Sequence, residues 1–365
     1  MHLNSGTKRQ PNDDLFGDSF TIVGQQSVPT GFSPKKKFGI IPTSIVSVLS
    51  DSNDNSHART HAVDELKILI DDAQNIQLIV PHFDGFVEFV GRLLDDHNFK
   101  VSSAAVEIIA ALVRRLPEKV IASKAESLVT VLCRRLGDTN ASVRQTVTKI
   151  FTQLMRIASS ATVLDSLCDI GLSHRNALVR QETLNLVIIA LLTFSSSDFD
   201  LPLIAETVAT ALIDGRRPVR QAALECYALL SHTLGPLKRS MLMAHISKVE
   251  ARNGGGSDLT AAVNARLSNC QLPKQDSSGG VEYATYLNRC YGTSTPSADV
   301  EWILSASAGH GSSAKSSYSD GGTSSRMSAL SCVSHVSDES QPFGSSKFRR
   351  SARRGLSRLP WDREV

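Results

Sequence analysis

The sequence has few cysteines, and none of them has a spacing that binds a metal or forms a redox pair. Its six cysteines lie far apart along 365 residues, and no two form a C-x-x-C motif. Cys133, Cys168 and Cys226 fall inside stretches with helical periodicity. This pattern favours reduced cysteines that act as small core residues in an intracellular protein.

Long apolar runs and a secretory leader are also missing. The longest apolar run extends from Leu184 to Phe194 and contains Asn185, and it is about half as long as a membrane span. No charged-then-apolar segment opens the sequence. We therefore expect a soluble protein of the cytoplasm with no membrane partner.

Catalytic signatures are absent from the sequence as well. There is no G-x-S-x-G elbow, and the glycine run at 253–257 is not followed by the Lys-Ser or Lys-Thr of a phosphate-binding loop. His57 and His61 are four residues apart but lack the H-E-x-x-H pattern of a zinc site. We interpret Asp95 and Asp96 as carboxylates of a solvated turn. The sequence thus predicts no enzyme, no metal and no cofactor.

What the sequence does contain is one pattern that occurs five times. A short polar turn leads into an apolar helix, most clearly in the stretch from Asp138 to Arg144, which reads DTNASVR. An asparagine stands three residues before the anchor of the pattern in four copies, and an arginine follows the anchor in four. The copies are about 36 to 43 residues apart, a period typical of paired-helix arrays. The anchors are Ala58, Val101, Val143, Val179 and Val219.

The residues after each anchor predict an amphipathic helix. In the second copy, apolar residues at offsets 0, 4, 7, 8 and 11 from the anchor form one helix face. The first copy fits less well because Glu65 falls on that face. A second helical pattern precedes each anchor, so one unit is helix, turn, helix. Neither helix can bury its apolar stripe alone, and we predict an all-α solenoid of about six stacked HEAT repeats.

The predicted repeat domain occupies residues 38–290, and the segments on either side lack a helical period. Residues 1–37 are predicted to be a disordered arm, and residues 291–365 a Ser/Gly-rich and then basic disordered tail. The sixth unit is degraded, as terminal repeats often are. Tyr283 and Trp302 are expected to pack locally in short ordered pieces.

Stacking places the polar turns side by side, and we call the edge that they form the turn ridge. It becomes more basic toward its C-terminal end. Solvation alone would explain a polar edge, but asparagines next to unpaired cations in successive turns favour an acidic protein partner. The turn ridge comprises Ser56, His57, Asn98, Phe99, Lys100, Val101, Asn140, Ser142, Arg175, Asn176, Arg216 and Arg217.

The arginines that follow the anchors are assigned to structure before binding. Asp138 with Arg144, and Asp214 with Arg220, are six residues apart across a turn. We expect such pairs, together with Arg180, to bond turn to turn as a ladder and to cap helix N-termini.

A HEAT array whose turns read D-x-N-x-x-V-R resembles a TOG domain, the tubulin-binding module of the CLASP and Crescerin (TOGARAM) families. The second turn, from Asp96 to Val101, and the fourth, from Asn176 to Glu182, are especially similar. The end of the array, from Val263 to Leu267 and from Gly280 to Tyr283, looks most like the first TOG domain of the Crescerin group, which acts in cilia.

The resemblance implies a regulator of the cytoskeleton that binds αβ-tubulin or the microtubule lattice through the turn ridge, in the cilium or axoneme. No nucleic-acid partner is expected. Early turns would meet β-tubulin through Phe99, Lys100 and Val101. Later turns would meet the acidic surface of α-tubulin through Arg175, Asn176, Arg216 and Arg217.

One position departs from the family pattern. Many TOG domains place a tryptophan in the first turn, where this sequence has Ser56. Loss of that anchor favours lattice binding assisted by the basic tail. Two alternatives stay open: a generic HEAT scaffold that binds a protein partner on its concave helix face, and an array that has lost tubulin binding and mediates other contacts.

Overall fold

The computed structural model describes residues 35–51, 55–254, 258–284 and 296–305. The predicted arm, apart from Lys35 to Lys37, and the tail from residue 306 onward lie outside the described residues. The chain divides into residues 1–35 and residues 36–365, and all the elements belong to the second unit.

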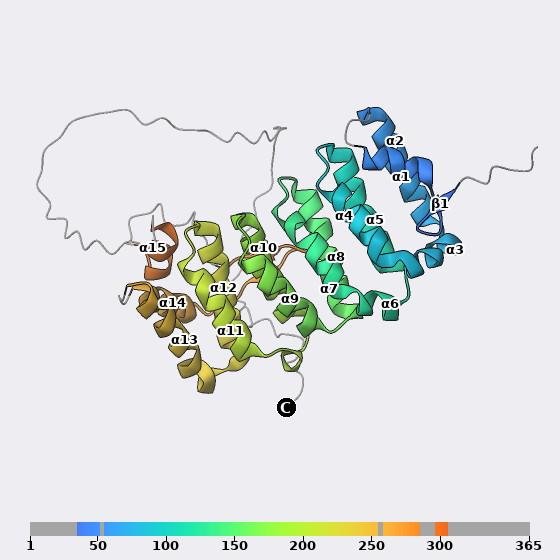
Figure 1. The fold of residues 1–365 in the computed structure, drawn as a ribbon. Helices are drawn as coiled ribbons and strands as arrows, with labels where there is room; N and C mark the ends of the chain where they lie inside the picture. Colours follow the sequence, from blue (N-terminus) through green and yellow to red (C-terminus); the bar gives the residue numbers. More distant parts are fainter. Residues whose placement is uncertain (1–34, 52–54, 255–257, 285–295, 306–365) are drawn as a thin grey trace, which may run out of the picture. The chain divides into compact units, whose positions relative to one another are not determined.

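Within the described residues, six helix pairs follow one another in chain order, as Figure 1 shows. This arrangement confirms the predicted all-α solenoid. The pairs are α1 (Thr43–Ser50) with α2 (Ser56–Asp71), α4 (Phe83–Leu94) with α5 (Phe99–Arg115), α7 (Ala125–Cys133) with α8 (Ala141–Ile157), α9 (Ser160–Leu172) with α10 (Ala177–Thr193), α11 (Leu201–Ala209) with α12 (Arg217–Leu234), and α13 (Arg239–Arg252) with α14 (Asp258–Ser268).

Short helices extend or connect these pairs. Two of the 3-10 helices continue a first helix toward its turn, namely η2 (Arg134–Gly137) and η4 (Thr210–Ile213). The others lie between pairs: α3 (Ala73–Ile76), η1 (Gln77–His82), α6 (Glu118–Ser123), η3 (Ser196–Asp198) and η5 (Pro236–Lys238). No helix in the described part of the chain is long and apolar enough to cross a membrane.

The core runs through the array because each helix buries the face that its periodicity predicts. The residues at the predicted offsets in α5, from Val101 to Leu112, are all buried. The second helices α2, α5, α8, α10 and α12 lie side by side. We call the side of the array that they form the second-helix face.

The first unit departs from the prediction because it stands at the end of the row. In the fourth unit, Val179 lies so close to Gly137 of the preceding turn that a Cβ on that glycine would be 2.7 Å from it. Ala58 has no preceding unit to cover it and is exposed. Glu65 was expected on the apolar face of α2, but it is exposed. The buried face of α2 instead consists of Arg59, Ala62, Val63, Leu66 and Ile70.

A small hairpin begins the array earlier than predicted. Strands β1 (Lys36–Lys37) and β2 (Ile41–Pro42) pair antiparallel. Phe38, at their turn, packs against Phe86 and Phe89 of α4, with ring centroids 5.6 and 5.7 Å apart. The disordered arm therefore does not extend to residue 37.

At the other end, residues 270–284, here called the strap, return across the second-helix face. They contain the antiparallel strands β3 (Lys274–Gln275) and β4 (Val281–Glu282). The hydroxyl of Tyr283 donates to Asn185 Oδ1 of α10 at 2.6 Å, and Gln145 Nε2 of α8 donates to Ser278 Oγ at 3.4 Å. In Figure 1 the strap is the orange segment that passes behind α12 and α10 toward α8. Tyr283 thus packs on the array and not locally.

A buried ion pair anchors the strap. Arg266 of α14 donates to both carboxylate oxygens of Glu225 on α12, at 2.7 and 3.2 Å, and both side chains are fully buried. Glu225 also accepts from the backbone N–H of Ala284 at 3.2 Å. The Arg266 guanidinium donates to the carbonyls of Asn269 and Gln271. Both ends of the strap are therefore tied to one pair.

Helix α15 (Ala298–Leu304) closes the array, although the sequence placed it in the tail. It packs against α12 and α14, and Trp302 Nε1 donates to the carbonyl of Leu212 at 2.9 Å. The predicted end of the domain at residue 290 is therefore too early, because residues 296–305 belong to the array. Trp302, like Tyr283, packs on the array.

Candidate functional site: the turn ridge

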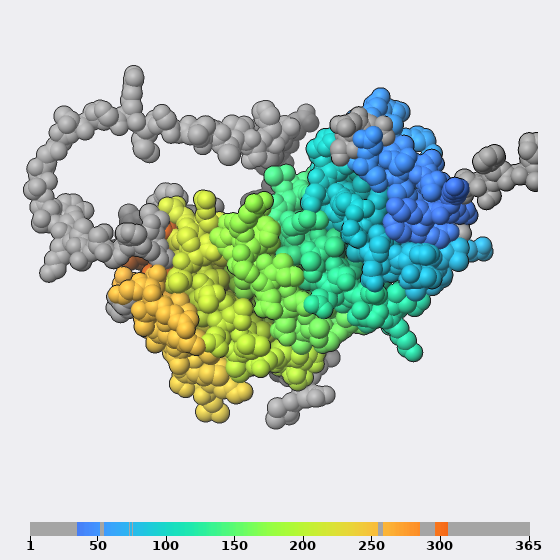
Figure 2. Space-filling view, viewed as in Figure 1, coloured from blue at the N-terminus to red at the C-terminus, as the bar shows by residue number. Residues whose placement is uncertain are grey.

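The turns between the two helices of the first five pairs lie along one edge of the array. This is the upper edge in Figure 1, and in Figure 2 the described residues of these turns lie along the same edge. Each turn joins the end of a first helix to the start of a second helix. The N-terminal ends of α2, α5, α8, α10 and α12 therefore all face this edge.

The repeated asparagines start the second helices. The side-chain Oδ1 of Asn98, Asn140 and Asn176 accepts from the backbone N–H two residues later, at 2.8 to 3.0 Å, and so satisfies a helix N–H that has no partner within the helix. Asn55 does the same for α2. The fifth turn has Arg216 in this place, followed by Pro218 in the first turn of α12, where a missing N–H costs little.

Two of these asparagines also join successive units. Asn98 Nδ2 donates to Ser56 Oγ of the preceding turn at 2.9 Å, and Asn176 Nδ2 lies 3.4 Å from the carbonyl of Gly137. Capping and stacking therefore explain why asparagine recurs. The asparagines do not by themselves indicate an acidic partner.

The predicted ladder of arginines is present, with a different set of carboxylates. Arg180 forms two bonds to the Asp214 carboxylate of the next unit, at 2.7 and 3.0 Å. Arg59 Nη2 pairs with Asp96 Oδ2 of the next unit, and Arg144 Nε lies 3.5 Å from Glu182 Oε1.

Within their own turns, Arg144, Arg180 and Arg220 each donate to a backbone carbonyl six residues earlier. Arg144 donates to the carbonyl of Asp138, and Arg220 to that of Asp214, both at 2.7 Å. In the predicted pairs Asp138–Arg144 and Asp214–Arg220, the arginine therefore binds the aspartate carbonyl and not its carboxylate. The interpretation of Asp96 as a solvated carboxylate is wrong, since its side chain is only 5% exposed.

The ladder ends at Arg220, which forms no ion pair with a described residue of the sixth helix pair. Its guanidinium is fully buried and donates to the carbonyls of Trp302, Ile303 and Ser305 at the end of α15, at 2.6 to 3.2 Å. Burial, and then the neighbouring Arg217, lower the pKa of Arg220. Helix α15 therefore supplies the acceptors that a next unit would have supplied.

The remaining ridge residues divide into exposed and buried. Val101 is fully buried in the core, so the structure removes it from the predicted contact surface. Phe99 beside it is 51% exposed, an unusual exposure for a large apolar side chain. Ser56, His57, Asn140 and Ser142 are exposed as well.

Four ridge cations are exposed and have no ion pair with any described residue. They are Lys100, Arg175, Arg216 and Arg217. An edge with one apolar side chain near one end and free cations toward the other suits a flat acidic protein surface. Among the described residues, no cluster of His, Cys, Asp or Glu could hold a metal ion.

Comparison with known proteins supports the class that this fold defines, a HEAT-type α-solenoid. The family model described as CLASP N terminal matches residues 41–251. TOG array regulator of axonemal microtubules protein 1 of Homo sapiens is 34% identical over 338 residues, which cover 90% of this chain and 18% of that protein. The Crescerin-like protein che-12 of Caenorhabditis elegans is 26% identical over 285 residues, covering 76% and 22%.

Solved structures agree with this assignment. One, described as "Crescerin uses a TOG domain array to regulate microtubules in the primary cilium", is 35% identical with a TM-score of 0.60, over 69% of this chain and 99% of that chain. The MAST/Orbit N-terminal domain shares the fold, with a TM-score of 0.50 at 19% identity over 64% and 97%. The chain belongs to the CLASP N-terminal family and carries a TOG domain of the Crescerin type. It spans only 18% of the length of the human relative.

Proposed function

We propose that this chain binds αβ-tubulin or the microtubule lattice through the turn ridge, and that it supports microtubule assembly or stability in the cilium. The observation that carries the proposal is the row of exposed, unpaired cations with Phe99 on one edge of the array. The names of the human relative and of the Crescerin structure refer to axonemal microtubules and to microtubules of the primary cilium. These names support the choice of partner.

The two ends of the turn ridge would contact different tubulin subunits. Phe99 and Lys100 in the second turn, with His57 in the first, would engage β-tubulin. Arg175, Arg216 and Arg217 in the later turns would meet the acidic surface of α-tubulin. Phe99 would supply an apolar anchor where the first turn has Ser56 and no tryptophan. The asparagines would hold these side chains in place without being the main contacts.

The basic cluster from Lys347 to Arg358 would add affinity for the lattice. It lies outside the described residues, so its part in the proposal rests on sequence alone. Six of its twelve residues are Lys or Arg. Exposed charges of this kind are screened by salt, and a tethered second contact raises the apparent affinity.

The second-helix face leaves less free surface for a scaffold partner than the sequence predicted. The strap occupies part of the second-helix face over α8 and α10 through Ser278 and Tyr283. A partner lying along the whole of that face would have to displace it. The part over α2, α5 and α8 stays open.

Microtubule co-sedimentation and gel filtration with unpolymerised tubulin test the proposal. The full-length chain should bind, and Lys100→Ala with Arg216→Ala should weaken binding by about tenfold or more, as for paired charges at an interface. A matched control is Lys119→Ala with Lys238→Ala, two exposed lysines between helix pairs and away from the turns. Equal binding by both double variants would refute the ridge. A chain ending at residue 305 measures the tail separately.

A further inference from the structure

Two adjoining hollows on the second-helix face are not explained by the turn ridge. The first, of about 440 Å³, lies between the C-terminal halves of α2 and α5 and the middle of α8. The second, of about 560 Å³, continues it across α5 and α8 to the strap, where Gln275 and Gly279 line it. The two share Arg114, Lys149 and Gln153, so they form one trough.

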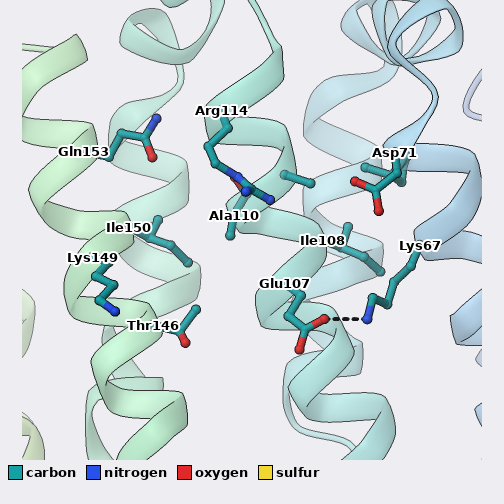
Figure 3. A pocket seen from close by; sticks show the side chains of 12 residues that line it. Lys67, Asp71, Glu107, Ile108, Ala110, Arg114, Thr146, Lys149, Ile150 and Gln153 are labelled. Atoms are coloured by element: carbon teal, nitrogen blue, oxygen red, sulfur yellow. Dashed lines mark hydrogen bonds and ion pairs between the residues drawn. The ribbon is translucent and has the colours of Figure 1, made fainter. Parts of the chain in front are cut away.

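The floor of the trough is apolar and its walls are charged. Ile70, Ile108 and Ile150 come from three successive second helices and form the floor together with Ala111. Figure 3 shows Lys149 with Ile150 on one side and the Lys67–Glu107 ion pair with Ile108 on the other, and Ala110 lies between the two sides. An apolar floor with a few polar groups around it is typical of a ligand site.

The charges of the walls do not cancel within the described residues. Glu107 is paired with Lys67, and Asp71 with Arg115 at 3.3 Å. The cations that remain have no carboxylate partner: Arg114 donates only to a carbonyl of its own helix, and Lys149 and Arg156 form no ion pair. Against these three cations the trough has one unpaired acid, Glu118.

We propose that this trough binds an acidic peptide segment that places an apolar side chain between its carboxylates. The carboxylates would pair with Arg114, Lys149 and Arg156, as basic clusters do with acidic motifs. The apolar side chain would cover Ile108 and Ile150. The trough is open over three helices, which suits an extended segment better than a small molecule.

This site is separate from the turn ridge and does not depend on tubulin binding. Lys100 and Arg114 are both on α5, and at a rise of about 1.5 Å per residue they lie roughly 20 Å apart along the helix. One array could therefore hold a partner at its edge and a peptide on its face at the same time.

Fluorescence polarisation of the full-length chain tests the trough with a labelled synthetic peptide that alternates glutamate and leucine. At low salt the chain should bind this peptide more tightly than a glutamate–serine or a lysine–leucine peptide. Arg114→Glu with Lys149→Glu should weaken binding by about tenfold or more. Ala110→Phe should also weaken it, because it fills the trough without changing any charge. Arg216→Glu with Arg217→Glu, on the ridge, should leave it unchanged.

Four results would overturn the proposal. They are no binding by the unaltered chain, equal binding of the glutamate–serine peptide, loss of binding only in the ridge variant, and preference for the lysine–leucine peptide. Self-association in gel filtration that Ala110→Phe abolishes would assign the trough to a second copy instead. Far-ultraviolet circular dichroism checks that each variant keeps its helical content.

Discussion

The buried ion pair between Glu225 and Arg266 gives a sharp prediction for how the C-terminal end of the array is held. Arg266→Ala removes a fully buried guanidinium with two bonds to Glu225 and one each to the carbonyls of Asn269 and Gln271. The Glu225 carboxylate stays buried without its cation. We therefore expect the free energy of unfolding to fall and the strap to loosen first.

The size of the effect follows from the burial. Breaking a buried pair by removing one partner typically costs about 3–5 kcal/mol, because a desolvated charge is left uncompensated. This is a large part of a total stability of about 5–15 kcal/mol. Replacing both residues by leucine should cost less than Arg266→Ala alone, since no unpaired charge remains, although the N–H of Ala284 and two carbonyls lose their partners.

Urea unfolding followed by circular dichroism measures the total change, and amide hydrogen exchange of residues 271–284 measures the local one. Lys124→Ala is the control, because it removes an exposed pair with Asp84 at 2.6 Å that contributes about 0–1 kcal/mol. A loss for Arg266→Ala no larger than that of the control would show that the buried pair does not hold the C-terminal end of the array. So would strap amides that exchange as slowly as before.

Two further predictions concern helix α15 and the thiols. Arg220→Met leaves the carbonyls of Trp302, Ile303 and Ser305 without their donor, so α15 should loosen. In a chain with Trp361→Phe, where Trp302 is the remaining tryptophan, the fluorescence emission should then shift to the red, and unchanged emission would contradict the role of α15 as a cap. Burial raises the pKa of Cys133 to about 11 and of Cys168 to about 12, so at pH 8 both stay protonated. Iodoacetamide should then modify exposed Cys270 well before them in the folded chain, and peptide mass spectrometry showing equal rates would contradict this.

The repeat and its core could be predicted because they depend on local periodicity. The offsets after Val101 and the asparagines of the first four turns specify a buried helix face and its N-cap within a few residues. The same periodicity marks Val101 as a core position. Its placement on the contact surface came from the family pattern, and the burial of the anchor overrides it.

The end of the array could not be predicted because its contacts join residues far apart in sequence. Glu225 and Arg266 are 41 residues apart, and Arg220 reaches Ile303 across 83. A lone carboxylate between Leu224 and Cys226 on a buried face was the one available signal. The ladder partners were missed for the same reason, since Arg180 pairs with the Asp214 carboxylate of the following unit and not with a carboxylate of its own turn.

The trough, too, had no local signature. Arg114 and Lys149 lie on different helices, and each alone looks like an ordinary exposed cation. Only the stacking of α5 against α8 brings them to one surface.

Hydrogen exchange of the full-length chain with and without αβ-tubulin shows whether the turns of the array contact tubulin. We expect slower exchange at the turns that carry Lys100, Arg175 and Arg216, with no change in α13 or at the trough. Protection confined to the second-helix face, with the turns unaffected, would contradict this expectation.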